Sequence, residues 1–227
     1  MGRIFEKYMP LKVLDFEDSI TSQIYDGSLK VPETMGNLIH LKYLNFRNSR
    51  IGSLPKSIGK LHNLEILDVR NTYVNNLPKE ISKLRKLRHL LGSSIYCDEE
   101  KEFLGGLTFL EKLGELNLYE NRVEMRELAK LKQLRDLRVC CYWAIERDAL
   151  CSLIDGMQFL EVLHIEAGNR GDEIIDLPLM SSLSTLRKLF LRGLLFKLGL
   201  RHSLNVQAQG LPKEASKMHK QSITVIA

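Results

Sequence analysis

The chain has 227 residues, of which 44% are hydrophobic and 27% are charged, a composition typical of soluble globular proteins. No stretch approaches the roughly 20 uninterrupted apolar residues that a membrane-spanning helix needs, so a membrane span is excluded. The 33 Lys and Arg residues against 28 Asp and Glu give a formal net charge of +5, which raises the question of an anionic partner such as nucleic acid. The four cysteines form no Cys-x-x-Cys pair, which favours a reducing, cytoplasmic location over a disulfide framework or a zinc site.

A single pattern, Leu-x-x-Leu-x-Leu, returns along most of the chain. The segment beginning at Leu41 recurs at Leu64, and the Leu-Pro pairs that follow at Leu54 and Leu77 keep the same 23-residue spacing. Repeats of about 20 to 29 residues with this pattern are typical of leucine-rich repeats. The sequence therefore predicts eight of them, starting at Leu11, Leu41, Leu64, Leu87, Leu113, Leu134, Leu160 and Leu186.

Elementary geometry explains the spacing within each repeat. Apolar residues two apart lie on one face of a strand, and the residue between them faces the other way. The Leu54-Pro55 pair then starts a helical or 3-10 turn, because Pro fixes φ, and Ile58 and Leu61 point back toward the strand. One such unit cannot bury its own apolar face, so neighbours must stack. The expected fold is an α/β solenoid, a horseshoe with a parallel sheet on its concave face and short helices, 3-10 turns and loops on its convex side.

Three features of the middle of the chain depart from or refine this pattern. Gly92 stands where the third apolar residue of its strand is expected, and the acidic run at 98–102 predicts a solvated loop or first helical turn. Asn121 occupies a position whose side chain can hydrogen-bond neighbouring turns, as Ser49 and Thr72 do earlier. The cluster Cys140-Cys141-Tyr142-Trp143 can be read as an aromatic anchor for a partner or, more simply, as residues packed at a turn.

The pattern is confined to residues 11–194, and the two ends differ from it. Residues 1–10 are expected to be an N-terminal remnant, too short for an ordinary capping element. Residues 195–227 carry five cations and one acid and form a divergent basic tail that we expect to be poorly ordered. Because this tail holds most of the net charge, the repeats themselves are nearly neutral, which argues against nucleic acid as the partner.

Several runs carry a family likeness. The runs 32–49 and 54–61, then 84–91, 126–135 and 180–193, are together similar to the leucine-rich-repeat region of plant intracellular nucleotide-binding disease-resistance receptors of the coiled-coil type. The likeness covers about residues 9–194. Such receptors carry a coiled coil and a nucleotide-binding module before the repeats. Neither is present in this sequence, so ATP binding is not assigned to it, and the resemblance indicates a fragment or truncated product of such a gene.

The sequence contains no motif that indicates catalysis, metal binding or cofactor binding. The segment from Gly52 to Leu61 looks like a phosphate-binding loop, but six residues rather than four separate its glycines, and Leu61 stands where Ser or Thr is required. The six histidines occupy different positions in the repeats or the tail. We therefore predict no catalytic residues, no metal site and no cofactor, and a protein that is not an enzyme.

Recognition is expected at the outward-facing strand positions. Arg and Tyr are common anchors of protein interfaces, although a solvated face that keeps the solenoid soluble is the simpler reading for any single residue. The candidate partner-binding residues on the concave face are Tyr43, Asn45, Arg47, Asp68, Arg70, Asn117, Tyr119, Arg138 and Lys188.

The resemblance implies a function in plant defence and innate immunity. The chain would recognise a protein, either a pathogen effector or a guarded host protein, and would restrain the receptor's own nucleotide-binding domain. The alternative is a free-standing leucine-rich-repeat signalling scaffold. Binding to nucleic acid is the least favoured class.

Overall fold

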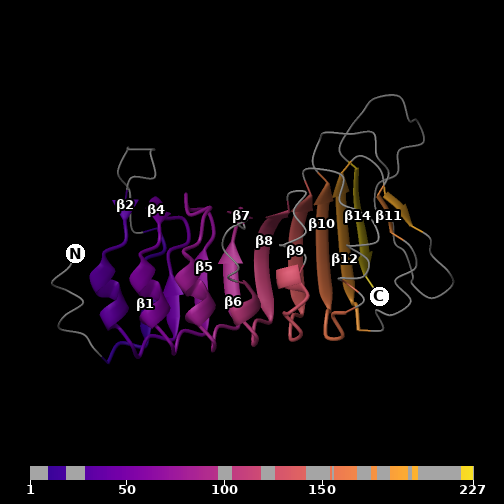
Figure 1. Cartoon of the computed structure of the whole chain (residues 1–227). Helices are drawn as coiled ribbons and strands as arrows, with labels where there is room; N and C mark the ends of the chain where they lie inside the picture. Colours follow the sequence, from indigo (N-terminus) through magenta and orange to yellow (C-terminus); the bar gives the residue numbers. More distant parts are fainter. Residues whose placement is uncertain are drawn as a thin grey trace.

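The computed structural model describes most of the repeat region and little of the two ends. The described residues are 10–18, 29–96, 104–118, 126–141, 154, 156–167, 175–177, 185–193, 196–198 and 221–226. They form an elongated solenoid in which successive strands stand side by side (Figure 1). Tyr119, Asn121, Tyr142, Trp143 and the acidic run at 98–102, all singled out in the sequence, lie outside the described residues.

The main sheet has ten strands. Eight run parallel along its length in chain order, β7 pairs in parallel with β8 beside that path, and β14 joins the last strand in the antiparallel direction. The eight strands on the path are β1 (Val13–Asp15), β3 (Tyr43–Asn45), β5 (Ile66–Val69), β6 (His89–Gly92), β8 (Lys112–Leu118), β9 (Asp136–Cys141), β10 (Val162–Ala167) and β12 (Lys188–Gly193), with β7 at Ile95–Tyr96 and β14 at Gln221–Ile226. The parallel solenoid predicted from the repeat is confirmed.

The other face of the first repeats is made of 3-10 turns. They are η1 (Glu33–Asn37), η2 (Lys56–Lys60), η3 (Lys79–Lys83) and η4 (Leu104–Gly106). Pro precedes each of the first three, with an extended backbone, and the amide of the leucine that ends each turn donates to a carbonyl within it. The Leu-Pro element thus does locally what its sequence predicts. A small parallel sheet of β2 (Leu29–Lys30) and β4 (Ile51–Ser53), and a second of β11 (Ile175–Leu177) and β13 (Phe196–Leu198), lie outside the main sheet.

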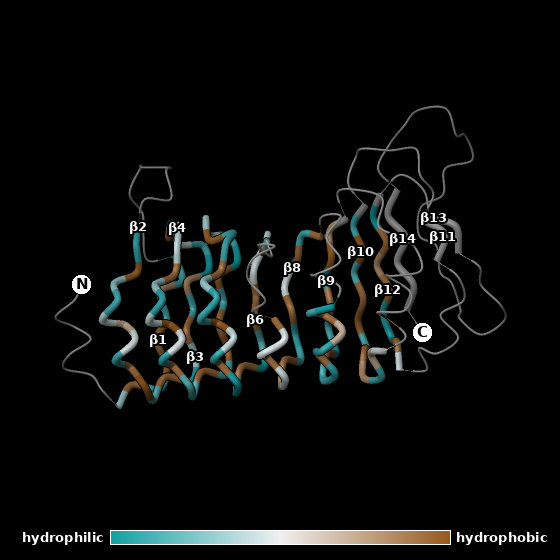
Figure 2. Tube along the Cα trace, in the orientation of Figure 1, coloured by the Kyte–Doolittle hydropathy of each residue, from teal (hydrophilic) through white to brown (hydrophobic). Residues whose placement is uncertain are grey.

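The core lies between the sheet and the turns. Hydrophobic and hydrophilic residues alternate along the strands (Figure 2), and one continuous cluster of leucines, isoleucines and valines runs from repeat to repeat. Leucines at one position of successive strands are fully buried: Leu44, Leu67, Leu90, Leu113, Leu137 and Leu163. A buried leucine contributes roughly 1.5 to 3 kcal/mol, so the stacking of neighbours supplies the stability that one repeat lacks.

The fifth repeat starts earlier than the sequence analysis placed it. Leu113 pairs with Leu90 on one side and with Leu137 on the other, so the repeat begins at Leu110, not at Leu113. The register shifts between Leu113 and Glu115, because Gly114 forms a bulge that adds one residue to the strand. Because of the extra residue, Leu113, Leu116 and Leu118 also match the Leu-x-x-Leu-x-Leu pattern. The pattern alone therefore places the start three residues too late.

Two glycines allow this bulge. A Cβ on Gly114 would come within 2.6 Å of the Gly92 carbonyl oxygen, and a Cβ on Gly92 would come within 2.6 Å of Ile95. Backbone therefore packs directly on backbone between β6 and β8, and Ile95 fills the space of the apolar residue that Gly92 replaces. The departure noted at Gly92 has a packing reason.

Parts of the basic tail form strands. β13 pairs with β11, and β14 covers the edge of β12, while residues 199–220 lie outside the described residues. The main sheet therefore continues for one strand beyond the last predicted repeat.

Candidate recognition surface on the concave sheet face

The side chains that point away from the core form three rows across the strands. Register places Asp15, Asn45 and Asp68 in one row, Tyr43 and Ile66 in the row before it, and the residues two positions later in a third. Because strands in a sheet lie roughly 4.8 Å apart, neighbouring members of a row contact one another. The polar members from the first three strands make up what we call the N-terminal polar cluster: Asp15, Glu17, Asn45, Arg47, Asp68 and Arg70.

Asn45 is the centre of this cluster. Its side-chain amide donates to Asp15 Oδ1 at 2.9 Å and to Glu17 Oε2 at 3.2 Å, and its Oδ1 accepts the Arg47 backbone amide at 2.9 Å. The residue is only 1% exposed. Asn45 was predicted to contact a partner; it instead positions the exposed residues around it.

Asp68 has the same role in the next repeat. Its Oδ1 accepts the Arg70 backbone amide at 3.0 Å, and the Arg70 guanidinium donates to both carboxylate oxygens, with Nη2 to Oδ2 at 2.5 Å. Asp68 is buried whereas the Arg70 side chain is 41% exposed. The hydrogen bond with Asp68 holds the pKa of Arg70 above its ordinary value. The charge available at the surface is therefore the cation.

The two arginines frame a half-buried tyrosine. The guanidinium of Arg47 lies 3.6 Å from Glu17, and its side chain is 42% exposed. Burial, followed by the nearby charges of Asp15 and Asp68, raises the pKa of Tyr43, which keeps its hydroxyl protonated. The charge of Arg70 also reaches Tyr43, and the buried Asn45 and Asp68 form the polar base of this surface.

The later strands carry a second group of polar residues with a different arrangement. Lys112 Nζ lies 2.6 Å from Asp136, and Arg138 Nε lies 3.8 Å from the other oxygen of the same carboxylate. His164 stacks on Phe190 with ring centroids 4.0 Å apart. Burial, with a further contribution from Arg138, lowers the pKa of His164 to about 4, so this ring is neutral near pH 7.

The remaining predicted site residues are dispersed. Asn117 lies on β8, fully buried, and neither atom of its amide has a hydrogen-bond partner among the described residues. Arg138 and Lys188 are exposed on β9 and β12, separated by β10. Asn117, Arg138 and Lys188 thus do not join the N-terminal polar cluster, and their contact with a partner stays a prediction.

Sequence reasoning missed several residues that shape this surface. Asp15 and Glu17 lie at outward strand positions. Their role as hydrogen-bond acceptors for Asn45 depends on the register between two repeats, which the sequence pattern does not give. Asp18, Asn48 and Asn71 adopt positive φ where the chain leaves three of the strands, a conformation that Asn and Asp tolerate best after Gly. An Asn at the same position of two successive repeats was the signal, and Asn71 Nδ2 does donate to Asn48 Oδ1 at 2.8 Å.

The chemistry of the surface is that of binding. Among the residues the structure describes, no group of three His, Cys, Asp or Glu side chains is arranged to hold a metal ion, and the described part of the chain contains no helix long and apolar enough to cross a membrane. The exposed Arg47 and Arg70, the second held by the buried carboxylate of Asp68, and the half-buried Tyr43 are residue types that anchor protein interfaces.

Comparisons with known proteins agree with the fold. Residues 3–203 match the family model described as "Leucine-rich repeat region". No curated protein matches the chain.

Solved structures share the architecture at low identity. A leucine-rich-repeat protein of Leptospira interrogans is 22% identical, with a TM-score of 0.50 over 73% of this chain and 45% of its own. A plant peptide hormone receptor, RGFR1 in complex with RGF2, is 20% identical, with a TM-score of 0.50 over 71% of this chain and 26% of its own. The PEPR1 chain of the PEPR1-AtPEP1 structure is 17% identical, with a TM-score of 0.51 over 74% and 23%. This chain spans less than half the length of each.

Proposed function

The chain belongs to the leucine-rich repeat region family, and we propose that it is the protein-recognition module of a plant intracellular disease-resistance receptor or a truncated product of such a gene. Leucine-rich repeats bind proteins or peptides and are typically non-catalytic. In this proposal the module acts in the cytoplasm, senses a pathogen effector or a guarded host protein, and restrains the receptor's nucleotide-binding domain when that domain is present.

The N-terminal polar cluster is the observation that supports a recognition role. Arg47 and Arg70 project from neighbouring repeats, and the backbone amide of each donates a hydrogen bond to a buried side chain, Asn45 or Asp68. The Arg70 guanidinium also donates to Asp68, and a side chain held in this way loses less conformational entropy when a partner binds. Arginine fixed beside an aromatic ring is the composition of interface hot spots.

Charge reversal at this cluster tests the proposal. Binders of the full chain are selected from a display library of plant proteins and secreted pathogen proteins, and their affinities are then measured for Arg47→Glu/Arg70→Glu. We expect the affinity to fall by more than about a hundredfold, since two central anchors are lost and two repulsive charges are added. The matched control, Arg126→Glu/Lys132→Glu, changes the charge equally at exposed positions outside the cluster.

Two outcomes decide the matter. Loss of binding in the cluster variant alone supports recognition on the concave face, whereas unchanged affinity in that variant removes the assignment. The alternative, a free-standing signalling scaffold, differs in its gene. An upstream reading frame that encodes a phosphate-binding loop favours the receptor, and a transcript that encodes the repeats alone favours the scaffold.

A further inference from the structure

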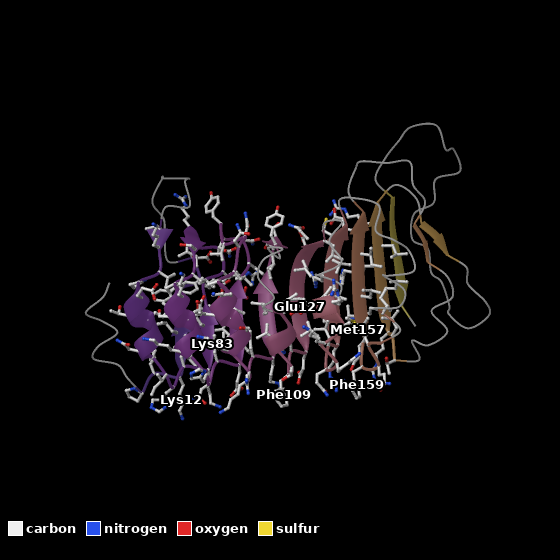
Figure 3. All side chains as sticks on the ribbon, in the orientation of Figure 1. Lys12, Lys83, Phe109, Glu127, Met157 and Phe159 are labelled. Carbon is white, nitrogen blue, oxygen red and sulfur yellow. The ribbon has the colours of Figure 1, made fainter. Side chains whose placement is uncertain are left out.

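A second surface lies on the side of the solenoid away from the concave sheet face. An open groove of about 690 Å³ is lined by His62, Ser82, Lys83, Arg85, Lys86 and Gly106. These residues come from η3, from the turn that follows it, and from the corresponding turns of the repeats on either side. Figure 3 shows Lys83 on this part of the molecule, with Phe109 projecting from the edge where the strands begin.

Two of the groove cations have no ion pair among the described residues. Lys83 and Arg85 are exposed and, within the described part of the chain, no carboxylate lies within ion-pair distance of either. Lys86 Nζ donates to the neutral amide oxygen of Asn63 at 2.8 Å, and its charge also acts on Glu65. In the described part of the chain, Lys83 and Arg85 are therefore the positive charges that the groove presents without an acidic partner.

In a nearby row of charged residues, by contrast, each cation forms an ion pair with an acid. At the positions just before the strands, Lys42 pairs with Glu65 at 2.7 Å and Arg88 pairs with Glu111 at 2.8 Å. A third pair joins Arg135 to Glu161 at 2.6 Å. These three cations each pair with an acid one repeat away, whereas Lys83 and Arg85 form no such pair with a described residue.

Exposed apolar residues flank the cations. Ile39 holds the position in its repeat that His62 and Arg85 hold in the next two, and it is 44% exposed. Phe109 holds the position one repeat after Lys86 and is 61% exposed. The side chain of Asn63 links these turns, because it donates to the Ile39 carbonyl at 2.9 Å and accepts from Lys86. Across the repeats, the apolar Ile39 comes first, His62 and Asn63 follow, Arg85 and Lys86 supply the cations, and the apolar Phe109 comes last.

We propose that this convex groove binds an acidic segment of a partner protein, one that carries aliphatic or aromatic side chains between its carboxylates. The carboxylates would pair with Lys83, Arg85 and Lys86, and the apolar side chains would cover Ile39 and Phe109. The site is separate from the N-terminal polar cluster, so the two surfaces can be occupied independently.

The extent of the charge favours a protein segment over nucleic acid. A nucleic acid backbone presents regularly spaced phosphates and is met by cations along a continuous stripe. Here the three cations come from one repeat, and the positions of Arg85 and Lys86 are held in the next repeat by Thr108 and Phe109. A short acidic segment matches a cationic patch of this length.

Fluorescence anisotropy on the full chain tests the inference. The probe is a short fluorescein-labelled peptide that alternates Glu with Leu and Phe, and its matched control has Gln in place of every Glu. We expect the acidic peptide to bind at least about tenfold more tightly than the amide peptide, a difference of about 1.4 kcal/mol. Lys83→Glu/Arg85→Glu is expected to weaken binding of the acidic peptide by about tenfold or more.

Three controls make the result specific. Arg126→Glu/Lys132→Glu carries the same change of charge in later repeats and is expected to keep the affinity within about twofold. Arg47→Glu/Arg70→Glu, on the concave face, is also expected to bind normally, which separates this site from the proposed function. Circular dichroism melting confirms that each variant folds. Because neither Lys83 nor Arg85 has an ion-pair partner in the described part of the chain, we expect unchanged melting temperatures.

Other results would overturn the inference. Equal binding of the acidic and amide peptides would show that the cations do not select the ligand. An equal loss in the groove variant and in the Arg126→Glu/Lys132→Glu control would show general charge attraction. Tighter binding of an oligothymidylate than of the acidic peptide, at the same salt concentration, would assign the groove to nucleic acid.

Discussion

The repeats up to β6 and those from β8 onward build the same sheet in different ways. In the first region the strands have three or four residues, Pro-initiated 3-10 turns recur every 23 residues, and the central Asn45 has all its polar atoms hydrogen-bonded. In the second region the strands have six or seven residues, the register shifts at Gly114, and the buried amide of Asn117 has no partner among the described residues. Regular spacing of the repeats therefore stacks the core and also brings buried polar side chains within hydrogen-bond distance of a neighbouring strand.

Buried polar side chains position the recognition residues of a repeat when its strand stays in register with its neighbours. When successive strands stay in register, a buried polar side chain in one repeat can hydrogen-bond acids in the repeat before it and the backbone of its own strand, as Asn45 does. The exposed arginines above then have fixed positions. Where a bulge interrupts the register, the described residues form no equivalent network, and the outward positions carry single ion pairs between neighbouring strands, such as Lys112 with Asp136.

The largest effect is expected at the junction between the regions. Gly114→Ala would place a methyl group 2.6 Å from the Gly92 carbonyl oxygen, against backbone that cannot rotate away, and we expect a loss of about 3 kcal/mol in the free energy of unfolding. Urea denaturation measures it. Gly105→Ala is the control, because the atoms it meets belong to the side chains of Lys130 and Glu127. A loss in Gly114→Ala that is no larger than the loss in Gly105→Ala would contradict the special role of backbone packing at the bulge.

The two buried asparagines give a sharper test, because the same substitution should act in opposite directions. Asn45→Leu leaves Asp15 and the Arg47 amide without their partner and is expected to destabilise the chain by about 2 kcal/mol. Asn117→Leu removes two buried polar atoms that have no partner among the described residues and is expected to stabilise it by about 1 kcal/mol. Chemical denaturation of both variants measures the difference, and a shared sign would contradict the contrast.

The smallest effect concerns pH and the second region. The pKa of His164 in the folded chain is about 4, below the roughly 6.5 of an unfolded histidine. The unfolded state therefore binds more protons between these values, so stability falls as pH drops from about 6.5 toward 4. His164→Asn should flatten this part of the stability curve. His89→Asn is the comparison in the first region, where burial also lowers the histidine pKa; an unchanged slope in His164→Asn would refute the assignment.

The sequence predicted the repeat architecture because that architecture depends on local spacing. Strands occur at all eight predicted repeats, and the turns begin after Pro32, Pro55 and Pro78 as expected. Leu113 was taken as a start because a one-residue bulge preserves the leucine pattern while it shifts the register. Only the hydrogen-bonded neighbours Leu90 and Leu137 reveal that shift.

The candidate site was predicted less completely, because burial at an outward position depends on neighbouring repeats. Asn45, Asp68 and Asn117 stand at positions that a strand pattern assigns to the surface, yet long side chains on either side cover the first two. Arg47 and Arg70 are exposed as the pattern implies. The groove on the convex side could not be seen in the strand pattern at all, since its residues belong to turns and meet only when three repeats stack.

Hydrogen exchange of the isolated full chain, read by mass spectrometry at peptide resolution, tests the central contrast most directly. The amides around β3 and β5 should exchange most slowly because the network above them is complete; they include that of Phe46, which donates to the Asp68 carbonyl in the next repeat, and that of Arg47, which donates to the Asn45 side chain. Amides flanking Gly114 in β8 should exchange faster. Equal protection across the bulge, or slower exchange in β8 than in β3 and β5, would contradict the account.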